Sequence, residues 1–339
     1  MISRIKPFTV VHDDIQNVAV PPAYAAALRH AVVALGNFDG VHRGHRVVID
    51  RAINLAQKLG SPAAALTFEP SPRAFFRPME PNFRIASPRS RLRLFAATEL
   101  DGAIVLDFNA ALATLHAGDF ISRLLVERIG ISGAVVGFDF HFGRARQGTP
   151  DFLKAEGERL GFAVEVVEAV TDTKRRFSSG GVRAALGAGD VADAADILGY
   201  PWFVSGEVIH GEKRGRDLGY PTANMRLDPG CGLRHGIYAV RVDAEGERYG
   251  GVASFGRRPT FDNGAPLLET FLFDFSGDLY GKVIDVAFIG WIRPEEKFTS
   301  IEALVARIDE DARQAKLMLD AAGDVFPPLG EISISSVKG

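Results

Sequence analysis

The sequence predicts two domains of different class, an α/β domain with a parallel sheet followed by an antiparallel β domain that ends in a long helix. Strand-like apolar runs alternate with helix-like stretches over roughly the first half of the chain. Beyond about Tyr200, runs rich in β-branched and aromatic residues are separated by Gly, Pro and Asp turns. The length of 339 residues exceeds what one hydrophobic core usually supports, so we expect two domains.

In the first domain, strands separated by helices predict a parallel sheet with right-handed crossovers. The predicted strands are Ala31 to Leu35, Ala63 to Phe68, Ala103 to Leu106, Gly133 to Val136 and Phe162 to Val167. The predicted helices are His45 to Leu59, Phe120 to Arg128 and Asp151 to Leu160.

The second domain is expected to be an antiparallel barrel or sandwich. Its predicted strands are Phe203 to Ile209, Ile237 to Val242, Tyr249 to Ser254, Leu267 to Phe275 and Val283 to Ile292. An amphipathic helix is predicted from about Ser300 to Ala321. A small-residue helix, Asp190 to Leu198, lies between glycines and indicates the boundary. We therefore expect domains at residues 14–186 and 190–325.

The composition limits the partners that the chain can have. A formal net charge of -3 gives no overall attraction to nucleic acid or to an anionic membrane, so a polyanion must be held by a local site. The sequence holds no uncharged apolar stretch of roughly 18 residues. The one cysteine, Cys231, excludes an intramolecular disulfide and suits a reducing compartment. We expect a cytoplasmic protein that binds no nucleic acid and no membrane.

The segment after the first predicted strand carries a clear chemical pattern, Gly36-Asn37-Phe38-Asp39-Gly40-Val41-His42-Arg43-Gly44-His45. A strand that enters a helix through a glycine turn gathers backbone N–H groups at one spot and favours a phosphate there. His42 and His45 share a helix face and can reach one phosphate chain, while Gly44 leaves room for its approach. This suits nucleotidyl transfer, because fixed donors stabilise the charge that develops on the phosphates.

Two nearby histidines at a helix start can also be a cap with surface exposure. The Gly-Asn-Phe-Asp-Gly prefix favours the functional interpretation, since the whole string resembles the H-x-G-H motif of nucleotidyltransferases in the form typical of FMN adenylyltransferases. The resemblance implies a Rossmann-like nucleotidyltransferase domain with His42 and His45 as catalytic residues. The residues that it implies for ATP binding in this segment are Gly36, Asn37, Phe38, Asp39, Gly40 and Gly44.

Three later segments continue the resemblance: Thr67 to Pro72, Val136 to Gly143 and Phe177 to Arg183. In the family, a Ser-Ser-Thr-x-x-Arg stretch begins a helix that holds the β- and γ-phosphates. This implies nucleotide binding by Ser178, Ser179 and Arg183. Taken alone, the stretch is only a capped helix start.

Asp139 lies in a segment that borders the nucleotide in the family, although an acidic residue among aromatics could equally orient a loop. Two positions differ from the family pattern. Gly180 stands where the family has threonine, and Ser71 stands where it has histidine.

A second pattern is a glycine-rich arc that leads into Pro221-Thr222-Ala223-Asn224. Its glycines are Gly206, Gly211, Gly215 and Gly219. Such an arc can bring backbone amides against a polyphosphate. If the following stretch is extended, Thr222 and Asn224 lie on one side and offer two oxygens for Mg2+. By itself, the stretch could equally be a turn with a capped strand.

Glu269 is the residue that we predict to be the base of this second site. In a strand it shares a face with Phe271, Phe273 and Phe275. A partly buried carboxylate beside aromatic rings is suited to accept a hydroxyl proton. The alternative is a glutamate at the rim of a strand, which spacing alone leaves open.

The companions of these residues follow the order of the riboflavin kinase pattern: Gly236 to Val240, Ser254 to Phe261, Glu269 to Phe275, Tyr280 to Lys282, and Arg293 to Glu295 with Phe298. The resemblance implies a kinase barrel in which Glu269 and Asn224 are catalytic and Thr222 and Asn224 hold Mg2+. It implies ATP binding by Gly211, Gly215, Gly219 and Thr222. It also places Arg293 on a flavin-side loop, although Arg293 could instead be a surface charge.

Both patterns together, over roughly Val32 to Leu319, resemble the bacterial bifunctional riboflavin kinase/FMN adenylyltransferases, also called FAD synthetases. The implied ligands are riboflavin, FMN, FAD and ATP, with Mg2+ at each site. Two alternatives stay open. One is a riboflavin kinase whose N-terminal module is inactive or uses another phosphorylated substrate, and the other is a flavin-binding regulator or carrier without turnover.

Overall fold

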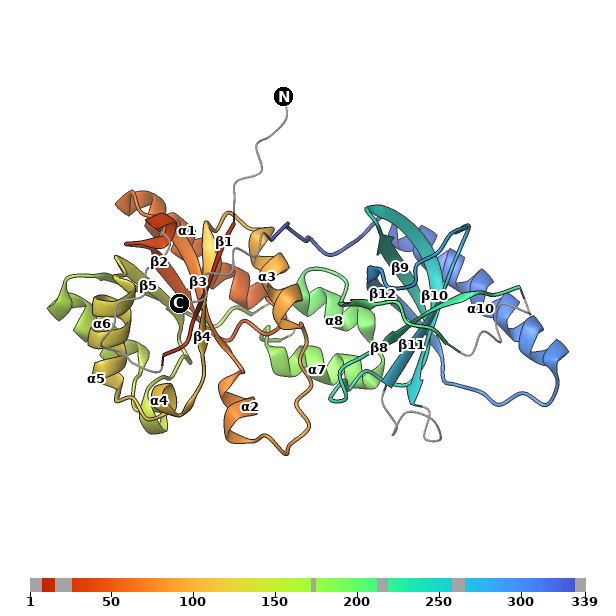
Figure 1. The fold of residues 1–339 in the computed structure, drawn as a ribbon, viewed down its shortest axis with the longest axis horizontal. Helices are drawn as coiled ribbons and strands as arrows, with labels where there is room; N and C mark the ends of the chain where they lie inside the picture. Colours follow the sequence, from red (N-terminus) through yellow and green to blue (C-terminus); the bar gives the residue numbers. More distant parts are fainter. Residues whose placement is uncertain (1–7, 16–25, 172–174, 212–218, 258–265, 333–339) are drawn as a thin grey trace, which may run out of the picture. The chain divides into compact units, whose positions relative to one another are not determined.

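The computed structural model describes residues 8–15, 26–171, 175–211, 219–257 and 266–332, and it forms two compact units (Figure 1). The first unit comprises Met1–Pro81, Pro88–Phe177 and Leu329–Gly339, and the second comprises Asn82–Ser87 and Ser178–Pro328. The described residues form one six-stranded sheet in each unit, the first parallel and the second antiparallel. This confirms the predicted fold class, and the domain limits 14–186 and 190–325 stay a prediction.

The parallel sheet has the strand order β1-β4-β3-β2-β5-β6. Its strands are β1 (Thr9–Asp13), β2 (Val32–Leu35), β3 (Ala63–Glu69), β4 (Gly102–Asp107), β5 (Gly133–Gly137) and β6 (Ala163–Val167). The chain moves outward from β2 first through β3 and β4, and then returns to the other side with β5 and β6. The strand order therefore reverses between β2 and β5, and the loops that follow these two strands diverge there. Open α/β sheets usually bind their ligands at such a switch point.

Helices cover both faces of this sheet. They are η1 (Ala26–Leu28), α1 (Arg43–Leu59), α2 (Pro72–Phe76), α3 (Pro88–Ala96), α4 (Ala110–Ala113), α5 (Ala117–Asp119), the π-helical η2 (Phe120–Ile129), η3 (Arg144–Arg146) and α6 (Pro150–Leu160). The core joins η2 to Val33 and Leu35. Leu55 of α1 lies on the opposite face, with Val32. A Cβ added to Gly133 would lie 3.3 Å from both side chains, so the two are neighbours. Alternate β2 residues thus point to opposite helical layers.

Strand β1 lies in a stretch whose polar residues gave no strand signal. Asp13 is 5% exposed, and its carboxylate accepts hydrogen bonds from Arg128 Nε at 2.8 Å and Nη2 at 2.5 Å. A buried charge needs such a partner. A strand with an inward-facing aspartate is therefore stable here because Arg128, far along the chain, pairs with it.

The antiparallel sheet has the order β7-β12-β9-β10-β11-β8. Its strands are β7 (Phe203–Glu207), β8 (Thr222–Arg226), β9 (Gly236–Ala244), β10 (Glu247–Arg257), β11 (Pro266–Leu272) and β12 (Val283–Arg293), and the unit's helices are α7 (Ser179–Ala188), α8 (Val191–Leu198) and α10 (Ile301–Ala322). Ile209, just after β7, donates its backbone N–H to the carbonyl of Asn224 in β8 at 2.8 Å. The two edge strands meet there, so the sheet curls into a near-barrel. Within the described ranges, every helix falls short of the length and hydropathy that a membrane crossing requires.

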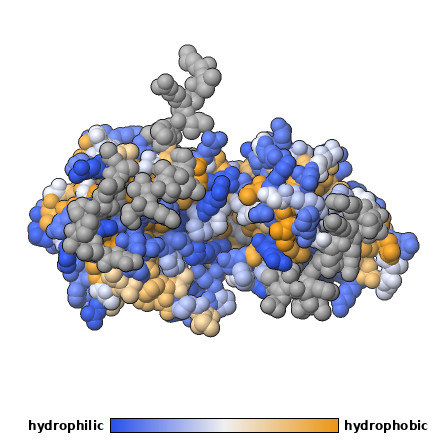
Figure 2. Space-filling model, in the orientation of Figure 1, coloured by the Kyte–Doolittle hydropathy of each residue, from blue (hydrophilic) through white to orange (hydrophobic). Residues whose placement is uncertain are grey.

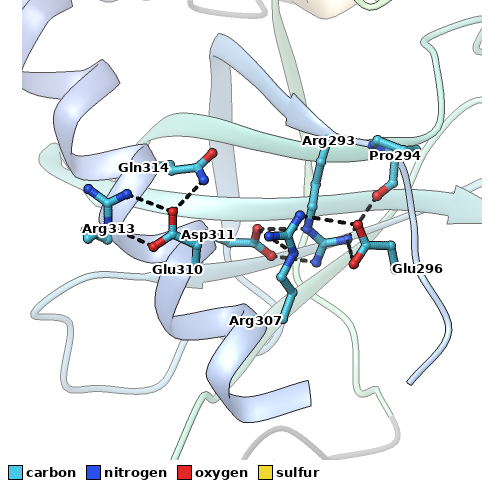
Figure 3. Close-up of polar contacts among 8 residues, drawn as sticks. All are labelled: Arg293, Pro294, Glu296, Arg307, Glu310, Asp311, Arg313 and Gln314. Atoms are coloured by element: carbon cyan, nitrogen blue, oxygen red, sulfur yellow. Dashed lines mark hydrogen bonds and ion pairs between the residues drawn. The ribbon is translucent and has the colours of Figure 1, made fainter. Parts of the chain in front are cut away.

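A buried ion pair ties α10 to the sheet (Figure 3). Arg293, the last residue of β12, donates from Nε and Nη2 to the Asp311 carboxylate at 2.8 and 2.6 Å. Both side chains are less than a tenth exposed, at 8% and 4%. Glu296 lies 3.7 Å from the same guanidinium. The alternative of Arg293 as a surface charge is wrong, because the guanidinium is buried against α10, while its place on a flavin-side loop stays a prediction.

The ion pair predicts a large stability effect in the second unit. Asp311→Asn removes the nearest counterion of the buried Arg293 charge. Breaking a buried pair typically costs about 3–5 kcal/mol, of which Glu296, at 3.7 Å, offsets a part. Urea unfolding followed by tryptophan fluorescence measures it, because both tryptophans, Trp202 and Trp291, belong to this unit. Glu310→Gln is the matched control on α10, since the Glu310–Arg313 pair is exposed and should leave the midpoint unchanged. Equal shifts in both variants would contradict the prediction.

Candidate functional site

The turn that joins β2 to α1 is a tight, strained coil at the carboxyl edge of the parallel sheet. Three of its residues have positive φ: Phe38 at 49°, Gly40 at 82° and Val41 at 39°. Positive φ is unfavourable for phenylalanine and for β-branched valine, so the surrounding packing must hold the coil. Phe38 and Val41 are 1% and 0% exposed. Asn37 and Asp39 of the same turn remain at least partly accessible.

His42 and His45 form a stacked pair at the start of α1, with ring centroids 3.6 Å apart. His42 is the N-cap, and its Nδ1 accepts a hydrogen bond from the His45 backbone N–H at 3.3 Å. Burial and the Arg176 charge lower the pKa of His42 to about 4. Burial, His42 and Arg91 hold the pKa of His45 well below its usual range. Both rings are therefore neutral near pH 7, and His42 carries its proton on Nε2.

The pair can therefore offer neutral N–H donors to a phosphate, rather than cations. His42 caps the helix, as the alternative held, but it is 6% exposed, so the surface exposure that this alternative assumed for it is wrong. The Nδ1 atom of His45 is buried and has no hydrogen-bond partner within the described part of the chain. Buried polar atoms usually have partners, so this nitrogen is suited to a ligand.

Two glycines of the motif lie in close packing. A Cβ on Gly44 would lie 3.2 Å from the Cε1 and Nδ1 atoms of His42, and one on Gly36 would lie 3.1 Å from the Phe38 ring. Both separations are tighter than an ordinary van der Waals contact. A side chain at either position would push the imidazole or the phenyl ring away.

Asp139 follows β5, the strand beside β2, and its exposed carboxylate pairs with Arg176 at 2.5 Å. The Arg176 guanidinium also lies 4.5 Å from the centroid of the Phe138 ring. The Arg176 charge lowers the pKa of His42 and the Asp139 charge raises it, so both side chains face the site of the histidine pair. The motifs did not identify Arg176, although it directly precedes the Phe177 segment.

The residues at the start of α7 belong to the second unit. Ser178 is its N-cap and accepts a hydrogen bond from the Gly181 N–H at 3.1 Å, as a capped helix start requires. Arg183 donates from Nε to the Phe83 carbonyl at 2.7 Å. The phosphate roles of Ser178, Ser179 and Arg183 stay a prediction from the resemblance.

A partly exposed aromatic group follows β3 and β4, and the sequence motifs did not identify it. Phe75, Phe76 and Phe108 pack edge to face, with centroids 5.2 to 5.8 Å apart. Phe76 is 62% exposed and Met79 is 93% exposed, and Figure 2 shows apolar side chains gathered over α2. Ser71, the other departure from the family pattern, caps α2 through its Oγ at 3.3 Å from the Ala74 nitrogen. The signal in the sequence is the adjacent phenylalanine pair just after Pro72.

The second site rests on a cross-strand register. Asn224 of β8 lies directly opposite Glu269 of β11, and Thr222 lies opposite Phe271. Directly opposed residues share a face, so Thr222, Asn224 and Glu269 come together although Glu269 is far along the chain. The interpretation of Thr222 to Asn224 as an extended segment with both side chains on one side is confirmed.

Asn224 is 4% exposed, and its Oδ1 has no partner among the described residues. Its Nδ2 donates to the Thr222 carbonyl at 3.1 Å and lies 3.4 Å from Thr222 Oγ1. A Cβ on Gly211 would lie 2.5 Å from this Nδ2, so only glycine lets the arc approach the amide. Gly219 has φ of 88°, while Gly215 lies outside the described residues.

The aromatic face predicted beside Glu269 is correct for two of its three members. Phe271 and Phe273 pack together at 5.8 Å under α10. Asp274 then has φ of 56°, which turns the chain. Phe275 packs instead against Tyr249, at 5.2 Å, so its predicted place on that face is wrong.

Comparison with known proteins gives matches over both units. A family model described as FAD synthetase matches residues 25–181, and one described as riboflavin kinase matches residues 198–319. Bifunctional riboflavin kinase/FMN adenylyltransferases are 41% identical over 86% of this chain and 93% of the protein in Pseudomonas fluorescens, and 38% identical over 87% and 96% in Haemophilus influenzae. A solved structure from Streptococcus pneumoniae, described as a macrolide-efflux protein, gives a TM-score of 0.79 at 32% identity, over 90% of this chain and 99% of that one.

The depressed pKa of His42 predicts a pH-dependent stability. The pKa of His42 is about 4 in the folded chain, against 6.5 for an ordinary solvated histidine such as that of the unfolded chain, so the unfolded chain binds more protons between these values. Stability must then fall as the pH falls through this window. Between about pH 7.5 and about pH 5, the stability advantage of wild type over His42→Gln should shrink by about 2 kcal/mol.

Urea unfolding followed by circular dichroism measures this difference. His141→Gln, at an exposed position of the same unit, is the control and should show the pH dependence of wild type. An advantage over His42→Gln that is the same at both pH values would refute the buried, neutral state of His42.

Proposed function

The chain belongs to the family of bifunctional riboflavin kinase/FMN adenylyltransferases, and from that premise we propose how its residues divide the two reactions. The kinase part transfers the γ-phosphoryl group of ATP to riboflavin, which gives FMN and ADP. The adenylyltransferase part joins FMN to the AMP portion of ATP, which gives FAD and pyrophosphate. The observation that carries the division is that the residues of each motif hold a buried polar atom without a partner among the described residues, His45 Nδ1 in the first unit and Asn224 Oδ1 in the second.

In the first unit, the ATP phosphates lie at the carboxyl ends of β2 and β5, against the start of α1. A phosphate oxygen of FMN attacks the α-phosphorus, the bond from that phosphorus to the bridging oxygen breaks, and pyrophosphate leaves with the electron pair. The Nε2–H of His42 and the ring of His45 donate hydrogen bonds to the phosphates. Such fixed donors act most strongly where charge develops in the transition state.

The isoalloxazine ring of FMN lies on the aromatic group formed by Phe75, Phe76 and Phe108. This group follows β3 and β4, on the side of β2 opposite β5. A flat aromatic ligand gains from rings that it can stack on or meet edge to face. The exposed face of Phe76, at 62%, supports this placement.

In the second unit, Glu269 accepts the proton of the ribityl 5'-hydroxyl as that oxygen attacks the γ-phosphorus and ADP leaves. The face that Glu269 shares with Asn224 and Thr222 places the base beside the phosphates. The glycines at 211 and 219 let the backbone approach the nucleotide.

Mg2+ fits the same face. The buried Asn224 Oδ1 needs a partner, Thr222 Oγ1 is its neighbour, and both are oxygen donors of the kind that Mg2+ prefers. When bound, the ion would neutralise phosphate charge. For the first site we propose Mg2+ from the family alone.

We also propose that the protein is located in the cytoplasm. Cys231 is buried without a disulfide, and burial raises the pKa of its thiol to about 11. An inert thiol suits a reducing compartment.

Glu269→Gln should abolish FMN formation from riboflavin and ATP, because the amide cannot accept the hydroxyl proton. A fall of at least about a hundredfold in kcat is expected. FAD formation from supplied FMN in the same preparation is the control and should stay unchanged. Chromatography separates riboflavin, FMN and FAD. Kinase activity near that of wild type in Glu269→Gln would show that Glu269 is not the base. If the wild-type protein itself forms neither FMN nor FAD, a flavin carrier is favoured.

His42→Ala and His45→Ala should each lower FAD synthesis from FMN and ATP by about a hundredfold or more, as the loss of one transition-state donor does. FMN formation from riboflavin should be spared, which shows that the loss is confined to the first unit, and circular dichroism of the variants tests whether that unit is folded. If wild type makes FMN and no FAD, the chain is a riboflavin kinase with an inactive N-terminal module.

A further inference from the structure

Arg91 is a buried arginine behind the first site, on α3, to which no motif drew attention. It is 6% exposed. Its Nη1 donates to the Asn37 carbonyl at 2.9 Å, and its Nη2 donates to the Phe68 carbonyl at 3.3 Å and to Glu69 Oε2 at 3.2 Å. One guanidinium therefore binds the turn after β2 and the end of β3 at the same time.

The same helix supports the turn through a second contact. Phe95, one turn after Arg91, meets the Phe38 ring edge to face at 5.4 Å, and the Phe38 ring meets His45 in the same way at 5.2 Å. Helix α3 thus holds both the carbonyl that precedes Phe38 and the Phe38 ring. Phe38 has a φ of 49°, a conformation that persists only where neighbouring groups determine it.

The two segments that Arg91 joins lead to different substrates. The turn after β2 carries His42 and His45, and the end of β3 leads through Glu69 to the aromatic group of Phe75 and Phe76. The planar guanidinium directs its N–H groups in a fixed fork, so it sets the spacing of its acceptors in a way that an ammonium group cannot.

We propose that Arg91 is a positioning residue for adenylyl transfer, which fixes the distance between the histidine pair and the flavin-side wall of the site. The inference rests on the function proposed for the first site. Small misplacements of bound reactants cost large factors in rate, so losing this connection should lower turnover more than it lowers ATP binding.

The charge of Arg91 gives a second readout. The charged or titratable groups that act on His45 are His42 on the turn and Arg91 on α3, while Arg176 and Asp139 act on His42. Because Arg91 helps to hold the pKa of His45 down, removal of its charge should raise that pKa. A lysine at the same place keeps the charge but loses the fork.

The experiment compares Arg91→Lys, Arg91→Gln and the control Arg89→Gln, an exposed position on the same helix, in the full chain. Steady-state FAD formation from FMN and ATP is measured against pH. We expect kcat to fall about 10- to 100-fold in both Arg91 variants, with KM for ATP changed less than threefold. The acid limb of kcat/KM should move to higher pH in Arg91→Gln and stay in place in Arg91→Lys and Arg89→Gln.

Urea unfolding followed by circular dichroism serves as the test of folding, because FMN formation from riboflavin reports on the second unit alone. If Arg91→Gln fails to fold, Arg91→Lys decides, since a tenfold fall in kcat supports the inference and a rate within twofold of wild type overturns it. Equal losses in Arg89→Gln would also overturn it. If His42→Ala and His45→Ala retain full FAD synthesis, the function proposed for the site fails, whereas normal rates in the Arg91 variants alone defeat only the inference.

Discussion

Both sites depend on one physical constraint, a polar atom buried where the described chain offers it no partner. Such an atom costs about 1–3 kcal/mol, so it persists only where the surrounding packing leaves no alternative. At His45, the stack with His42 and the edge of the Phe38 ring hold the imidazole. At Asn224, the backbone is fixed on both sides, by β11 and by the Ile209 bridge. The free energy lost at each of these atoms is regained when a bound ligand forms the missing hydrogen bond.

The two sheets reach this arrangement by different routes. In the parallel sheet, all strands end at one edge, so the turns after β2, β3, β4 and β5 gather there whatever their spacing in the sequence. In the antiparallel sheet, the register decides, because a slip of one residue would turn Asn224 or Glu269 to the opposite face. The closing bridge at Ile209 helps to fix this register at the very residue that the site needs.

Sequence reasoning identified the strands well because most are short, continuous apolar or β-branched runs between turn residues. It missed β1, whose inward Asp13 is compatible with burial only through Arg128. It also left open a surface position for Arg293, because the buried partner Asp311 lies on the following helix, at a distance that no local pattern encodes. Motif spacing predicted roles for His42, His45, Thr222 and Asn224, but Arg91 looks like any other arginine of a polar helix until its acceptors are known.

Arg293 links the terminal helix to the strands that carry Asn224 and Glu269. The register continues from Asn224 and Glu269 through Ser254 and Ile237 to Arg293, so the ion pair with Asp311 lies in the same cross-strand row as the proposed base. At the other side of the sheet, the Tyr220 hydroxyl, next to the Thr222 segment, donates to Asp309 of α10 at 2.5 Å. Two carboxylates two residues apart on α10 therefore attach the helix to both ends of the proposed catalytic face. The terminal helix thereby becomes a wall of that face, held in place by charge and hydrogen bonds as well as by apolar packing.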